Sequence, residues 1–236
     1  MAKILHIETA TQICSVALSE NNEIILSRQS DKKNAHSSVL TVFIDEIFRE
    51  TGVNVHQLDA VSVSMGPGSY TGLRIGVSAA KGLCYAADKP LIAVNTLEAM
   101  AFGMIKMAFL KFENITDFLF CPMIDARRME VYSAIFNAQL ESIRAVKAEI
   151  IDEQSFAELL IQHKIIFAGD GAEKCKNLFA TNQNAIFLDD FTPSANYLVE
   201  IANLKFKEKN FENVAYFEPF YLKDFIAGPP KVKGLV

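Results

Sequence analysis

The stretch Ser64-Met-Gly-Pro-Gly-Ser-Tyr-Thr-Gly-Leu-Arg-Ile-Gly76 holds four glycines and one proline between an apolar run and a helix-like sequence. An apolar run at 60–63 followed by a rigid turn and a helix N-terminus predicts a strand, a turn and a helix in direct succession. This arrangement is typical of sites that hold an anion or the backbone of a partner. The segment lacks the Gly-Lys-Ser/Thr ending of a Walker A loop, and its glycine spacing differs from the dinucleotide-binding fingerprint.

The composition is that of an acidic chain of 236 residues, of which 50% are hydrophobic, with a net charge of -5. This length favours one large domain or two modest ones. A protein that binds nucleic acid unaided usually has a basic surface, so the charge predicts that any role with RNA is indirect. The N-terminus begins as a strand without a signal peptide, and no run of about 18 apolar residues predicts a membrane span. We therefore expect a cytoplasmic protein that contacts no membrane.

Two blocks with a similar order of elements follow one another along the chain. Each contains hairpin strands, a helix, a strand and another helix, which predicts an α/β protein with two related lobes of mixed sheets flanked by helices. We place the first lobe at 1–100, the second at 101–222 and a flexible tail at 223–236, and expect the helix at 194–209 to pack back on the first lobe. The expected strands cover 4–9, 14–19, 24–28, 60–63, 91–94, 118–124, 130–136, 143–151 and 165–168, and the expected helices cover 35–51, 71–87, 155–162, 172–179 and 194–209, with one more helix capped by Thr96.

The turn Ile7-Glu8-Thr9-Ala10-Thr11, between the first two strands, resembles the phosphate-binding hairpins of actin-type and sugar-kinase-type ATPases. Such turns carry an acidic residue and, two positions later, a glycine that allows backbone N–H groups to approach a phosphate. Here Ala10 occupies the glycine position. The sequence therefore predicts a weakened nucleotide site built from Glu8, Thr9, Thr11, Gly169, Asp170 and Gly171. A plain hairpin turn is the alternative.

Two helices of the first block carry more apolar or small residues than packing on one sheet requires. The apolar positions from 39 to 48 cover about half of the helix circumference, whereas a helix packed on one side needs a stripe of roughly 100°. Small residues recur at spacings of three and four in the helix after the glycine segment, which allows close approach of another helix. We predict a partner interface made by His36, Val39, Leu40, Phe43, Ile47, Gly72, Arg74, Ile75, Gly76, Ala79, Ala80 and Leu83, beside a structural turn made by Gly66, Pro67, Gly68, Ser69, Tyr70 and Thr71.

Packing of both helices within their own lobe is the alternative to this interface. If the interface exists, a leucine at Gly76 is expected to keep the partner helix away without unfolding the lobe.

The remaining reactive residue types give weak signals. Asp125, Arg127, Arg128 and Glu130 surround a turn, and they either line a cleft between lobes or form a solvated charge cluster. His36 lies at a helix start, where it could act as a cap or an interface donor. The histidines form no HExxH motif and no pair at i, i+4, so the sequence predicts no metal site. No GxSxG serine and no cysteine near a histidine offers a nucleophile, and the four separate cysteines favour reduced, buried thiols.

The order and spacing of these motifs over about residues 4–171 closely resemble the TsaB family, also called YeaZ, of the bacterial system that makes threonylcarbamoyladenosine in tRNA. The resemblance rests most on the glycine segment at 66–76. It is supported by Ile7-Glu-Thr-Ala-Thr11, Cys14-Ser-Val-Ala-Leu18, Ile124-Asp-Ala-Arg127, Glu130-Val-Tyr132, Ala168-Gly-Asp-Gly171 and Pro219-Phe-Tyr-Leu222.

The resemblance implies an actin-like, ribonuclease H-like ATPase fold and a non-catalytic role. It implies a scaffold that forms a heterodimer with the paralogue TsaD and activates this transferase, while a TsaE-type ATPase joins the assembly. ATP and metal are expected on those partner subunits, with no cofactor on this chain. Alone, the chain is expected to form a homodimer through the helices at 35–51 and 71–87. Many family members carry Asp at the position of Glu8, so this chain departs from the family pattern in its phosphate turn.

Two enzyme hypotheses stay open beside the scaffold. The turns at Glu8 and Asp170 suggest a nucleotide-binding phosphotransferase or ATPase of the actin and sugar-kinase class, and tight binding of ATP and Mg²⁺ by the isolated chain would favour it. A metallopeptidase, a label that family members often carry by sequence similarity, would need stoichiometric zinc or iron, for which the sequence has no ligand motif.

Overall fold

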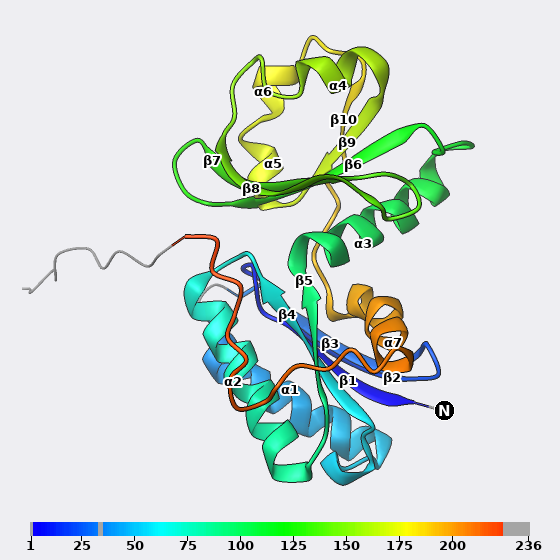
Figure 1. The fold of residues 1–236 in the computed structure, drawn as a ribbon, viewed down its shortest axis with the longest axis vertical. Helices are drawn as coiled ribbons and strands as arrows, with labels where there is room; N and C mark the ends of the chain where they lie inside the picture. Colours follow the sequence, from blue (N-terminus) through cyan, green and yellow to red (C-terminus); the bar gives the residue numbers. More distant parts are fainter. Residues whose placement is uncertain (1, 33–34, 224–236) are drawn as a thin grey trace, which may run out of the picture.

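The computed structural model describes residues 2–32 and 35–223, which form two lobes, each built on a five-stranded mixed sheet (Figure 1). The strands of the first lobe are β1 (Lys3–Glu8), β2 (Cys14–Glu20), β3 (Glu23–Ser30), β4 (Ala60–Gly66) and β5 (Leu91–Asn95). Those of the second lobe are β6 (Phe118–Asp125), β7 (Glu130–Phe136), β8 (Ser142–Ile150), β9 (Lys164–Ala168) and β10 (Ala185–Phe187). The helices are α1 (His36–Thr51), η1 (Val55–Gln57), α2 (Tyr70–Ala87), α3 (Thr96–Lys111), α4 (Ala157–Gln162), α5 (Asp170–Glu173), α6 (Lys176–Phe179), η2 (Ala195–Leu198) and α7 (Val199–Lys207).

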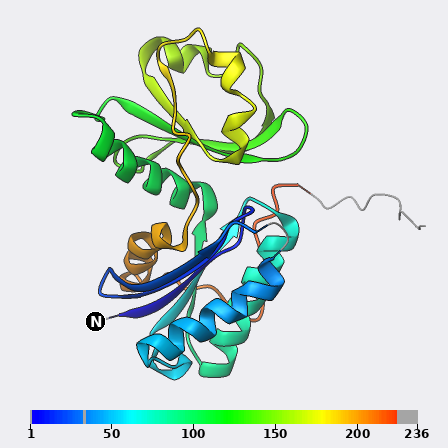
Figure 2. The same cartoon turned by 180° about the vertical axis from the view of Figure 1, so that it is seen from behind.

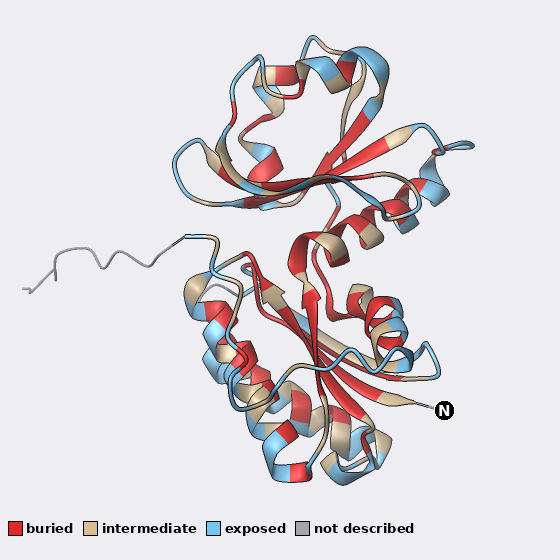
Figure 3. Ribbon diagram, in the orientation of Figure 1, coloured by how far each residue is buried: buried red, intermediate tan, exposed pale blue. Residues whose placement is uncertain are grey.

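The two sheets have the same topology, which confirms the predicted pair of related lobes. Their strand orders are β3-β2-β1-β4-β5 and β8-β7-β6-β9-β10. In each lobe the first strand pairs antiparallel with the second and parallel with the fourth. Strands that are covered on both faces need apolar side chains on both, and the central strands are buried along nearly their whole length in both lobes (Figure 3).

The helices are divided between the two lobes, but not in chain order. Helices α1 and α2 cover one face of the first sheet, while η2 and α7 cover the other (Figures 1 and 2). Lys205 of α7 donates to the carbonyl oxygen of Ala93 at 2.7 Å. Helix α3 packs on the second sheet through Met100 and Met104, while its Ala99 belongs to the core of the first lobe. Residues 195–222 therefore lie on the first lobe: the helix expected at 194–209 packs there as anticipated, whereas 210–222 was placed in the second lobe.

The C-terminal segment 212–222 also runs along the first lobe. The Glu212 N–H donates to the Leu91 carbonyl oxygen at 2.9 Å, and Phe217 is buried in the core beneath α1 and α2. Lys81 of α2 donates to the Phe217 carbonyl oxygen at 2.8 Å. Of the predicted tail at 223–236, only Lys223 lies within the described residues.

Two local expectations differ from the structure, and one strand was not predicted. Asn95, not Thr96, caps α3, because its short side chain accepts from the N–H groups of Leu97 and Glu98, whereas the Thr96 hydroxyl accepts from Gly66. The helix expected at 172–179 is two short helices, α5 and α6. Strand β10 has only three residues, which is too short for a periodic signal.

Among the described residues, no helix has both the length and the apolar character needed to cross a bilayer.

Candidate functional site

A cleft of about 620 Å³ lies between the lobes, where the carboxyl ends of β1, β4, β6 and β9 face one another. In open α/β sheets, ligands bind at the carboxyl ends of parallel strands, so this cleft is the first candidate for a binding site. The first lobe contributes the β1–β2 turn and the start of α2, and the second contributes the β6–β7 turn and the start of α5. Its polar lining comprises Thr11, Gln12, His36, Ser37, Ser69, Tyr70, Thr71, Asp125, Arg127, Tyr132, Asp170, Tyr221 and Lys223.

The glycine segment is packed against the β1–β2 turn of its own lobe. A Cβ atom at Gly72 would lie 2.1 Å from the Thr9 carbonyl oxygen, and one at Gly76 would lie 2.2 Å from Thr9 Oγ1. The Ser69 N–H donates to the Ala10 carbonyl oxygen at 2.7 Å, which holds the two turns together. The small residues of this part of α2 are therefore required by contacts inside the lobe. A leucine at Gly76 would disturb the fold itself, contrary to the prediction from the sequence.

The predicted structural turn is shorter than expected. The Gly66–Pro67 peptide bond is cis, and Gly66 has a φ of 117°. Ser69 is the N-cap of α2, because its Oγ accepts from the Gly72 N–H at 3.3 Å. Tyr70 and Thr71 are consequently the first residues of the helix and lie outside the turn.

The β1–β2 turn does not fit a nucleotide phosphate. Glu8 is 1% exposed, and its Oε1 accepts from the Ala10 N–H at 2.6 Å. The Thr9 N–H donates to Ser64 Oγ at 3.3 Å, and Thr11 Oγ1 accepts from the Ile13 N–H at 3.2 Å. Burial raises the pKa of Glu8 to about 7. The backbone donors of Thr9 and Ala10 are used within the protein, so this turn cannot cradle a phosphate as the phosphate-binding hairpins do.

The predicted glycine turn at 169–171 packs on β6. A Cβ atom at Gly169 would lie 2.2 Å from the Met123 carbonyl oxygen, and one at Gly171 would lie 2.8 Å from the Ile124 carbonyl carbon. Asp170 accepts from the Asp125 N–H at 2.9 Å, and burial raises the pKa of Asp170. This turn therefore also serves a contact between two neighbouring strands, which accounts for its two glycines without a ligand.

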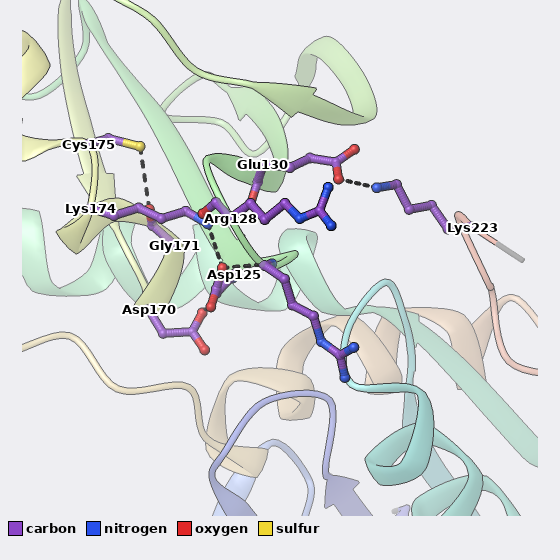
Figure 4. Close-up of polar contacts among 9 residues, drawn as sticks. Asp125, Arg128, Glu130, Asp170, Gly171, Lys174, Cys175 and Lys223 are labelled. Carbon is purple, nitrogen blue, oxygen red and sulfur yellow. Dashed lines mark hydrogen bonds and ion pairs between the residues drawn. The ribbon is translucent and has the colours of Figure 1, made fainter. Parts of the chain in front are cut away.

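Lys174, the residue directly after α5, holds the β6–β7 turn in place, as Figure 4 shows. Its ammonium donates to Asp125 Oδ1 at 2.5 Å, to the Arg128 carbonyl oxygen at 2.8 Å and to the Glu130 carbonyl oxygen at 2.6 Å. On the other side of the turn, Lys223 forms an ion pair with Glu130 (Figure 4). Asp125 and Arg127 line the cleft, whereas Arg128 and Glu130 lie outside its lining, so the first of the two alternatives raised by the sequence holds for two of the four charges.

The C-terminal segment forms the rim of the cleft. The Phe220 N–H donates to the Met65 carbonyl oxygen at 2.7 Å, and the rings of Tyr221 and Tyr70 lie 5.0 Å apart. Sequence reasoning missed Lys174, Tyr221 and Lys223 as site residues. For Lys174 the only available signal was its distance of one helical turn from Asp170. Tyr221 lies in the motif at 219–222, which did not show that long-range packing brings it to the cleft, and Lys223 had no signal.

The predicted partner interface is only partly accessible. Leu40, Ile47 and Ala80 are buried in the core of their own lobe. His36 is also buried, with Nε2 3.2 Å from the Ile13 carbonyl oxygen, and it caps no helix. Together with Gly72 and Gly76, these residues cannot form the contact surface. Those that keep accessible surface are Val39, Phe43, Arg74, Ile75, Ala79 and Leu83.

The potential metal-ligating side chains of the described part of the chain are not clustered. Residues 2–32 and 35–223 contain no group of three or more His, Cys, Asp or Glu side chains that could hold a metal ion. The four cysteines are buried and unpaired, as the sequence predicts. No described residue set therefore supports the metallopeptidase hypothesis.

The repeated sheet topology and the cleft between the lobes define a two-lobed protein of the actin-like class. The family model described as "TsaD: tRNA N6-adenosine threonylcarbamoyltransferase" matches residues 24–230. The TsaB protein of Escherichia coli is 30% identical over 95% of this chain and 96% of its own length, and that of Haemophilus influenzae is 29% identical over 94% and 93%. YeaZ from Pseudomonas aeruginosa has a TM-score of 0.71 at 24% identity and covers 94% of this chain and 100% of its own. The chain belongs to the TsaB family of tRNA threonylcarbamoyladenosine biosynthesis proteins.

Proposed function

We propose that this chain is a non-catalytic scaffold in the formation of N6-threonylcarbamoyladenosine on tRNAs that read codons beginning with A. It pairs with a TsaD-type transferase and activates it. This role is supported by the β1–β2 turn. There Glu8 and Ser64 accept hydrogen bonds from the backbone N–H groups that a nucleotide phosphate would need. A fold of the actin-like class without a working phosphate turn is suited to contacts with other proteins and poorly suited to phosphoryl transfer.

ATP and metal are then bound by the partner subunits, the TsaD-type transferase and a TsaE-type ATPase. The phosphotransferase alternative is tested by calorimetry of the isolated chain with ATP and Mg²⁺. We expect no binding in the millimolar range. Micromolar affinity would overturn the scaffold role and restore the alternative.

The outer face of α1 and α2 is the surface that we assign to the partner, and in its absence to a second copy of the chain. Val42 and Tyr85 are 46% and 86% exposed on these helices. At Gly82 a Cβ atom would meet nothing within 4 Å, unlike at Gly72 and Gly76. A glycine inside a helix costs about 0.5–1 kcal/mol relative to alanine. No contact within the described chain offsets this cost, which supports close approach of a partner helix at Gly82.

Tyr85→Ala is expected to raise the dissociation constant of the heterodimer with the TsaD-type paralogue about 30-fold, because central tyrosines contribute about 2 kcal/mol to interfaces. Light scattering after size-exclusion chromatography and titration calorimetry measure the change. Phe109→Ala serves as the matched control, since Phe109 is 65% exposed but lies on α3 in contact with the second lobe. Equal affinities for both variants would show that the face of α1 and α2 is not the interface.

The role in tRNA modification is tested in cells. Depletion of this chain is expected to reduce the threonylcarbamoyladenosine content of total tRNA, measured by mass spectrometry of nucleosides. Wild-type protein and Phe109→Ala should restore the content, whereas Tyr85→Ala should restore it only in part. An unchanged nucleoside content after depletion would exclude the proposed function.

A further inference from the structure

The tip of the β6–β7 hairpin presents two adjacent arginines in an unfavourable backbone conformation. Arg127 and Arg128 have φ values of 73° and 54°. Residues other than glycine, asparagine and aspartate rarely adopt this left-handed region, because Cβ approaches the following carbonyl oxygen. Both side chains are exposed. The turn would form more easily with asparagine or glycine. Arginine at both positions is therefore not explained by the stability of the turn, which points to a functional role for the side chains.

The side chains of the two arginines make no hydrogen bond that holds the turn, which is fixed through backbone groups and Asp125. Lys174 holds the turn through Asp125 and two backbone carbonyl groups (Figure 4). Within residues 2–32 and 35–223, neither the Arg127 nor the Arg128 guanidinium forms a hydrogen bond or an ion pair. The backbone is therefore fixed while both guanidinium groups stay available. This arrangement reduces the entropy that a ligand must remove on binding.

The surroundings of the turn favour a phosphate-bearing, aromatic ligand. The planar guanidinium group matches two oxygens of a phosphate. Tyr132 lines the same cleft, and across its mouth Tyr70 and Tyr221 stand 5.0 Å apart with the Arg74 guanidinium 5.3 Å from the Tyr70 ring. Tyrosine rings and arginines together are the groups on which unstacked bases of single-stranded RNA lie. An acidic peptide would use the charges but not the three rings.

The two carboxylates nearest the turn do not oppose such a ligand strongly. Asp125 is paired with Lys174, and Glu130 is paired with Lys223. Their negative charges are thus compensated locally, although the whole chain carries a net charge of -5. An acidic chain with one basic turn is expected to bind RNA weakly alone and to add a contact within a larger assembly.

We propose that Arg127 and Arg128 bind backbone phosphates of an unpaired stretch of the tRNA substrate and hold it across the mouth of the inter-lobe cleft. This inference rests on the proposed function, because it takes tRNA as the substrate of the assembly. The net charge predicted that this chain does not contact tRNA directly. The inference differs, because it assigns the chain a direct contact with tRNA within the complex.

The test compares tRNA binding by the complex of this chain with its TsaD-type paralogue, using fluorescence anisotropy of labelled, unmodified tRNA over a series of salt concentrations. Arg127→Asn combined with Arg128→Asn is expected to weaken binding about 10-fold at 0.15 M salt and to reduce the slope of log K against log salt by about 1.5. Because asparagine accepts the left-handed conformation, Tm should not fall. The control is Lys207→Asn combined with Lys209→Asn, which removes two exposed positive charges at the end of α7 and should change neither quantity.

Three results would overturn the inference. The first is unchanged tRNA affinity of the Arg127 and Arg128 variant, and the second is an equal loss in the lysine control. The third is loss of the paralogue from the variant complex, which would identify the turn as a protein contact. The first two results leave the proposed function intact, provided that the wild-type complex forms and modifies tRNA. If the wild-type complex neither forms nor binds tRNA, the proposed function fails together with this inference.

Discussion

Gly72→Ala is expected to lower the free energy of unfolding by about 3 kcal/mol, whereas Gly82→Ala should raise it by about 0.5–1 kcal/mol. Both positions lie in α2, so both substitutions improve the intrinsic helix propensity. They differ in space: the new methyl group would lie 2.1 Å from the Thr9 carbonyl oxygen at position 72, and nothing lies within 4 Å at position 82. The neighbour at Gly72 is backbone, which cannot rotate away as the end of a flexible side chain does.

Thermal and urea unfolding of the two variants measure this difference. For a chain of this size each kcal/mol corresponds to roughly 2–4 °C, so Tm of the Gly72→Ala variant should fall by about 6–12 °C. Gly82→Ala is the matched control, because it carries the same chemical change in the same helix. Similar Tm values for the two variants would show that the contact between α2 and the β1–β2 turn does not determine the fold of the first lobe.

The second prediction concerns two fully buried titratable groups in the first sheet. His6 lies 2.6 Å from Ser62 Oγ and 2.8 Å from Ser19 Oγ, and burial lowers its pKa from 6.5 to about 3. Burial raises the pKa of Glu8 from 4.5 to about 7. Between pH 4.5 and 6.5 the folded chain therefore keeps both groups neutral, whereas unfolding protonates His6 and ionises Glu8. The two proton changes cancel, so these groups leave the stability of the wild type nearly independent of pH in this window.

Removing either group should expose the effect of the other. In Glu8→Gln only His6 remains, and since the unfolded state then binds more protons, the free energy of unfolding should fall by about 2 kcal/mol from pH 6.5 to pH 4.5. In His6→Gln only Glu8 remains, and the folded state binds the extra proton, so stability should fall by about the same amount as pH rises from 4.5 to 6.5. Urea unfolding at pH 4.5, 5.5 and 6.5 measures both slopes relative to the wild type. Three parallel profiles would show that these two groups are not buried in their neutral forms.

The local elements were largely predictable from the sequence because each depends on neighbouring residues. Buried strands such as β1 and β4 are apolar runs of strand length, and α1 ends at Gly52 with a left-handed φ of 69°. The repeated order of strands and helices also indicated two related lobes. The glycine segment was correctly placed between a strand and a helix, and its family resemblance agrees with the comparisons.

The candidate site was predictable only in part, because a pattern of small or apolar residues does not say what packs against it. Gly72, Gly76 and Gly82 look alike in the sequence, yet two of them face Thr9 and the third faces open space. Leu40 and Ile47 belong to the broad apolar face of α1, but both side chains are buried in the core of their own lobe and cannot contact a partner.

The sequence by itself determined the strands, the helices, the repeated order and the family of this protein, since these follow from local periodicity, turn chemistry and motif spacing. Only the tertiary structure decided which lobe α3 and α7 pack on, that segment 212–222 reaches the cleft, and that Lys174 fixes the turn bearing Arg127 and Arg128. Each of these depends on contacts between residues far apart in the chain. Such contacts form when whole faces of helices and sheets are buried against one another, and no short stretch of sequence specifies which faces meet.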